Sequence, residues 1–132
     1  ADRAGAAVPV VSGLALEAAG LALLSRAAPE STVVLVAAAL FVAGFGLGMF
    51  QVPNMAVVMA AFPAGQQGAA GGFTFLARTL GIVAGVLGLA HFFAARRLVI
   101  GLAPAASEAF LVAGLTVALA AIVAAATRGG AR

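Results

Sequence analysis

Glu17 is the residue whose type and position most strongly suggest chemistry, because it lies near the centre of the first long apolar stretch. An ionisable group in mid-membrane costs at least ~2.5 kcal/mol and usually faces a helix bundle or water. Gly13 and Gly20 share its helical face, so this face is suited to close helix packing. Two interpretations stay open: a carboxylate that exchanges protons or pairs with a cation, and a structural residue that stays protonated or ion-paired.

Arg78 is the second candidate, in the third apolar stretch. Small and polar residues recur there at three-to-four spacing, which predicts a narrow helical face made of Gly71, Thr74, Arg78, Gly81, Gly85 and Gly88. If the first and third helices start from the same membrane face, Glu17 and Arg78 both lie about 15 Å deep. We therefore expect them to form an ion pair that stabilises the bundle.

The second apolar stretch carries two amide side chains, Gln51 and Asn54, on either side of Pro53. Gly44 and Gly48 lie on the same helical face as Gln51. The proline frees a backbone carbonyl about one turn earlier, which an amide or water must satisfy. The two amides therefore either line a polar cavity at a depth close to that of Glu17 and Arg78, or only repair the kink.

Composition places the chain in the membrane class. Of its 132 residues, 64% are hydrophobic and 8% charged, too few charges to cover a soluble domain. There is no cysteine, and no metal-ligand cluster, catalytic triad or carboxylate pair, so we expect no enzyme, metal or cofactor. The net charge of +3 comes from scattered arginines rather than a basic run, which argues against nucleic acid as a partner.

The elements that position these residues are four transmembrane helices, so the predicted fold is an all-α polytopic membrane protein. The expected spans are residues 7–25, 32–62, 69–95 and 108–127. Ser107 and Glu108 are expected to cap the fourth span. An even number of crossings places both chain ends on one side, but the positive-inside rule is tied between the two sides. The chain starts at Ala1 without a basic leader, from which we expect a fragment of a longer protein.

Three segments in order resemble the C-terminal part of a major facilitator superfamily transporter, most similar to the 14-helix drug:proton antiporters. Asp2, Arg3 and Gly5 resemble the "A-D-R-x-G" portion of a cytoplasmic loop motif. Residues 44–54 resemble the "G-x-G-x-G…P" of the antepenultimate helix, and residues 63–85 resemble the following turn and the penultimate helix. Ala6-Ala7 and Gln67 depart from the family pattern, which has basic residues at these points.

The resemblance implies a proton-coupled exporter of hydrophobic or amphiphilic compounds that works by alternating access. It directs Gln51, Asn54 and Arg78 toward the cavity and makes the helix of Glu17 peripheral. The implied partners are the lipid bilayer, the remaining helices of the same transporter, a small amphiphilic substrate and protons. The implied location is a bacterial plasma membrane, with both termini in the cytoplasm. Four helices cannot build both walls of a pathway, so we expect the chain to be inactive alone.

Two alternatives stay open. One is a self-contained four-helix multidrug carrier acting as a dimer, since such carriers also hold a mid-membrane glutamate in their first helix. This chain has no Trp or Tyr for the aromatic cage that a cationic substrate requires there. The other is a non-transporting membrane subunit whose glycine-lined faces pack against a partner.

Overall fold

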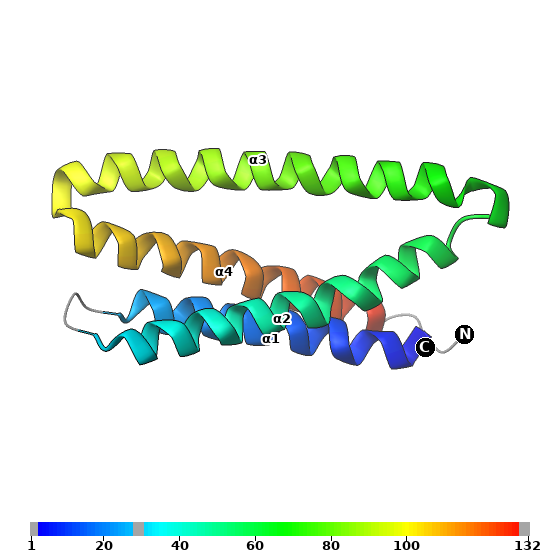
Figure 1. Cartoon of the computed structure of the whole chain (residues 1–132), viewed down its shortest axis with the longest axis horizontal. Coiled ribbons are helices and arrows are strands. Elements are labelled where there is room, and N and C mark those ends of the chain that lie inside the picture. The colour runs from blue at the N-terminus through cyan, green and yellow to red at the C-terminus, as the bar shows by residue number, and fades with distance from the viewer. Residues whose placement is uncertain (1–2, 28–30, 130–132) are drawn as a thin grey trace.

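The computed structural model describes residues 3–27 and 31–129 as four long helices joined by short turns (Figure 1). The elements in chain order are α1 (Arg3–Ser25), α2 (Val33–Ala60), the short 3-10 helix η1 (Ala64–Gln66), α3 (Gln67–Ile100) and α4 (Leu102–Gly129). The described residues contain no strand. All four α-helices are long and apolar enough to cross a membrane, which confirms the predicted all-α membrane protein with four helices.

The helices end where the backbone requires it. Pro63 separates α2 from η1 in an extended conformation, because proline cannot donate the hydrogen bond that would continue a helix. Gly101 ends α3 with a φ of 89°, in the left-handed region that glycine tolerates. Its amide donates to the carbonyl of Arg97 at 3.1 Å. One glycine therefore reverses the chain between α3 and α4.

The start of α4 differs from the expectation. The predicted cap at Ser107 and Glu108 is wrong, because α4 begins at Leu102 and both residues lie within the helix. Pro104 falls in the first turn of α4, where an amide has no helical partner and proline is accepted. At the other side of the turn, α3 continues through Arg96 and Arg97. The apparent loop is thus a tight hairpin of two helices.

The four helices do not pack equally. α1 packs along both α2 and α4, while α3 contacts α4 near their shared turn and α2 only near the η1 turn. Figure 1 shows α3 running beside the bundle of the other three helices for most of its length. Its 34 residues are about 51 Å long at about 1.5 Å per residue, more than a bilayer core of about 30 Å. In a membrane α3 therefore tilts or protrudes.

The buried part of the molecule is small and lies where α1 meets α2 and α4. Val10, Leu14 and Ala121 form its centre, with Phe50 and Val117 packed against them. Most other large apolar side chains are exposed, as expected for surfaces that face lipid or further helices. The fold thus places α1 centrally and leaves α3 almost uncovered.

Candidate functional site

Glu17 lies in the close contact between α1 and α2. A Cβ atom at Gly13 would lie 2.6 Å from the Phe50 backbone nitrogen, and one at Gly20 would lie 2.5 Å from that of Ala43. Only glycine permits such an approach, which confirms that the face shared by Gly13, Glu17 and Gly20 is a packing face. The Glu17 side chain is half-buried, and no hydrogen bond or ion pair joins it to another residue in the ranges 3–27 and 31–129.

Gln51 and Asn54 lie on α2, which continues as a helix through Pro53. Both side chains are half-buried. Neither donates a hydrogen bond to another residue of the described chain, including the carbonyl that Pro53 leaves free one turn earlier. The two amides therefore do not satisfy the backbone carbonyl that Pro53 leaves free. Both stay available for a ligand, water or another helix.

The relative depth of these residues follows from the α1–α2 contact. Gly46 lies level with Glu17. At about 1.5 Å per residue, Gln51 is about 8 Å and Asn54 about 12 Å farther along α2. The carboxyl and the two amides therefore lie one to two turns apart along the membrane normal rather than at one level.

Arg78 lies on the uncovered part of α3. Every residue from Phe75 to Gly88 is exposed. The neighbouring Gly81 and Gly85 have open space where a Cβ would stand. Among the residues that the structure describes, no acid pairs with Arg78.

The expected ion pair between Glu17 and Arg78 is absent within residues 3–27 and 31–129. The reason is topological: α3 contacts α4 and α2 but does not contact α1. Glu17 and Arg78 thus belong to separate surfaces, and the prediction that they pair within this chain is wrong.

The remaining predicted residues are spread over the molecule. Of the glycines expected to pack helices, Gly44 and Gly48 have nothing within 4 Å of a Cβ position, like Gly81 and Gly85. A Cβ atom at Gly71 would lie 3.3 Å from the Met59 Cε, at the α2–α3 corner. These positions contribute little packing inside the chain, and their role toward other helices stays a prediction.

The loop motif lies at the edge of the described region. Asp2 is outside the described residues, while Arg3 begins α1 and Gly5 lies in its first turns. The start of α1 and the end of α4 lie at the same end of the bundle, and the α3–α4 turn lies at the opposite end (Figure 1).

The ion pair that does form was not predicted from the sequence. Arg96 on α3 holds Glu108 on α4 with two hydrogen bonds, Nε to Oε2 at 2.6 Å and Nη2 to Oε1 at 2.7 Å. This planar, two-point geometry is the strong form of an arginine–carboxylate contact. The signal was an arginine five residues before Gly101 and a glutamate seven residues after it, but this signal is visible only once Gly101 is read as a hairpin turn.

A second missed contact joins α4 to the end of α1. The Ser107 hydroxyl donates a hydrogen bond to the Ser25 carbonyl, which is among the last of α1 and has no partner within its own helix. Ser107 therefore caps the carboxyl end of α1 from a neighbouring helix instead of the amino end of its own.

The comparisons with known proteins add no relative. No known family profile matches the chain, and neither curated proteins nor solved structures give a significant match. No cluster of three or more His, Asp or Glu side chains that could hold a metal occurs in the described ranges. The site is therefore characterised by its geometry: a half-buried carboxyl, two unbonded amides and an exposed arginine on three apolar helices.

Proposed function

We propose that this chain supplies four helices to a proton-coupled exporter of hydrophobic or amphiphilic compounds. The proposal joins the ordered motifs that resemble the major facilitator superfamily to four helices that are long and apolar enough to cross a membrane. Under it, the start of α1 and the end of α4 lie on the cytoplasmic side of a bacterial cell membrane.

The observation that carries the proposal is the uncovered arginine of α3. Arg78 lies eleven residues into a helix that crosses the membrane, and its surroundings from Phe75 to Gly88 are exposed. An arginine in contact with lipid within the hydrocarbon region is unfavourable, by ~2.5–3.5 kcal/mol at the helix centre on insertion scales, and such residues usually face a bundle interior or a water-filled pathway. Other helices of the carrier therefore cover this side of α3, together with the open positions at Gly81 and Gly85.

Each polar residue has a role in this proposal. Gln51 and Asn54, unbonded within the described chain, contribute hydrogen-bonding groups to the substrate pathway. Arg78 balances the charge of a substrate or of a carboxylate on a covering helix. Glu17, in the α1–α2 contact away from α3, is peripheral and keeps the structural role.

A dimer of this four-helix chain is the second candidate. The same uncovered face favours it, because Gly81 and Gly85 would let the α3 helices of two copies approach closely. In that arrangement a copy of the chain, rather than further helices of one polypeptide, covers Arg78.

Reconstitution separates the two candidates. The product of the full reading frame that contains this chain, and the 132-residue chain itself, are placed in proteoliposomes with a pH gradient, and ethidium movement is followed by fluorescence. We expect gradient-driven transport by the full product only. Arg78→Gln should lower the rate at least about tenfold, while the neighbouring Thr79→Val, which removes a hydroxyl bonded only within its own helix, should not.

Each other outcome is informative. Transport by the 132-residue chain alone would favour the dimeric carrier. Absence of gradient-driven transport from both preparations would refute the export proposal and favour a subunit that only packs against a partner.

A further inference from the structure

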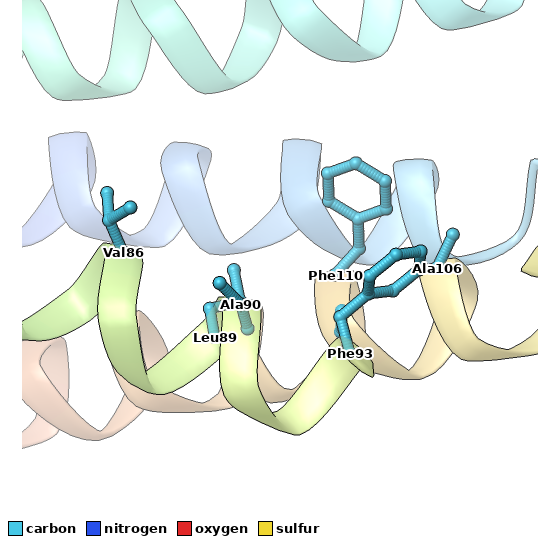
Figure 2. Close-up of a pocket in the computed structure, with 7 residues that line it drawn as sticks. Val86, Leu89, Ala90, Phe93, Ala106 and Phe110 are labelled. Carbon is cyan, nitrogen blue, oxygen red and sulfur yellow. The ribbon is translucent and has the colours of Figure 1, made fainter. Parts of the chain in front are cut away.

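An apolar groove lies between α3 and α4, next to their turn at Gly101 (Figure 2). It has a volume of about 350 Å³, and the side chains that line it include Val86, Leu89, Ala90, Phe93, Ala106 and Phe110. In Figure 2 the α3 side chains and those of α4 lie on facing helices around it. No polar side chain lines this groove.

A cationic residue, Arg97, follows the groove-lining residues of α3 on the side of the turn at Gly101. Arg97 follows Phe93 by four residues and therefore continues the groove-lining face of α3. The adjacent Arg96 is neutralised by Glu108. Arg97 is exposed, and no ion pair involves it in the part of the chain that the structure describes. The groove thus combines an apolar wall with one positive charge that pairs with no acid among the residues that the structure describes.

We propose that this groove binds one acyl chain of an anionic phospholipid, with the lipid phosphate paired to the Arg97 guanidinium. A water molecule takes up roughly 30 Å³ in the liquid, and a methylene group is of similar size. A groove of this volume therefore has room for about twelve methylenes. From Arg97 to Val86 the groove face extends about 16 Å along the helix axis, close to half of the ~30 Å hydrocarbon thickness. These dimensions fit a lipid of a single leaflet whose headgroup lies at the membrane surface beside the turn.

The size of the groove argues against a protein occupant. A helix about 10 Å across occupies about 1,200 Å³ over the same length, several times the volume present. The positive charge selects among lipids, because a basic residue at the membrane surface attracts anionic headgroups. This inference goes beyond the transport proposal, since it requires only that the α3–α4 hairpin lies in a bilayer.

Native mass spectrometry of the full chain in detergent tests the proposal. The protein is offered equal amounts of phosphatidylglycerol and phosphatidylcholine with identical acyl chains. We expect about fivefold greater retention of phosphatidylglycerol, the effect of about one basic residue at a membrane surface. Arg97→Gln should bring the ratio to about one, while Arg97→Lys should keep most of the preference.

Two further variants separate the groove from general charge effects. Ala90→Phe, at an exposed groove position, fills the groove and should lower the retention of both lipids. Arg26→Gln removes an exposed arginine at the end of α1 that does not line the groove, and should leave the preference unchanged. Circular dichroism confirms that each variant keeps its helices.

The proposal is overturned if the unaltered chain retains both lipids equally, if Arg97→Gln keeps the preference, or if Ala90→Phe retains both lipids normally. Displacement of phosphatidylglycerol by an equal concentration of glycerol phosphate would also overturn it, because the acyl chain would then contribute nothing. Should Arg97→Gln fail to fold, Arg97→Lys and Ala90→Phe still decide the result.

Discussion

Gly46 of α2 lies directly against the backbone of Glu17 in α1. A Cβ atom at Gly46 would overlap the Glu17 backbone nitrogen and would lie 2.5 Å from the Gly13 carbonyl oxygen. Backbone atoms cannot move aside as a flexible side chain can, so residue 46 sets the distance between the two helices. The position of the carboxyl-bearing residue in α1 therefore depends on a missing side chain in α2.

Gly46→Ala should destabilise the chain by about 1–3 kcal/mol, the usual effect of forcing extra atoms into a close-packed contact. The measurement is the free energy of unfolding in detergent. Gly44→Ala is the matched control, because nothing lies within 4 Å of its Cβ position. Alanine favours a helix over glycine by about 1 kcal/mol, so the control should be neutral or stabilising. Equal effects of both changes would mean that α1 and α2 do not approach as described.

Glu17→Gln and Arg78→Gln should have independent effects on stability, because α1 and α3 share no contact. In a double-mutant cycle we expect the free energies of unfolding to add within about 0.5 kcal/mol, as for distant sites. The cycle needs both single variants and the double variant in the same detergent. A coupling energy above about 1 kcal/mol would show that Glu17 and Arg78 interact directly, which contradicts the helix contacts of this structure.

Arg96→Glu and Glu108→Arg should each lower the Tm of the chain, because each places two like charges across the α3–α4 turn. The double variant that exchanges the two residues should recover much of the loss. Both side chains are about 40% exposed, Arg96 at 41% and Glu108 at 39%, so the total effect should be small and should shrink in high salt. Arg97→Glu at the neighbouring position serves as the control. If Arg97→Glu lowers the Tm and adding Glu108→Arg restores it, the result would contradict the pairing of Arg96 with Glu108.

Ser107→Ala should lower the free energy of unfolding by about 0.5–1.5 kcal/mol, because it removes the hydroxyl that satisfies the Ser25 carbonyl. Thr116→Ala is the comparison, since the Thr116 hydroxyl bonds only to the Val112 carbonyl of its own helix. Amide hydrogen exchange should quicken near the end of α1 for Ser107→Ala alone. Unchanged exchange there would show that Ser107 does not hold α1 to α4.

The four helices were predictable because hydrophobic length and composition act locally. Any run of apolar residues long enough to cross a bilayer must satisfy its backbone within itself, and a helix does this. The helix limits were less predictable. The sequence pattern predicts a loop between residues 95 and 108, whereas a single residue, Gly101, makes the turn.

The packing face of α1 was also predictable, since Gly13, Glu17 and Gly20 follow helical spacing. The glycines of α3 follow the same spacing, yet Gly81 and Gly85 meet nothing within the described chain. Spacing identifies a face that suits close approach, but it does not name the helix that approaches.

The sequence by itself determined that this is an all-α membrane protein and which residues are polar in its apolar helices, because both follow from composition and from the periodicity of single helices. Only the tertiary structure decided which of those residues meet. It pairs Arg96 with Glu108 rather than Glu17 with Arg78, and it sets Glu17 against Gly46. Contacts between helices depend on turn geometry and on which helices are neighbours, and neither is encoded in the pattern of any one helix.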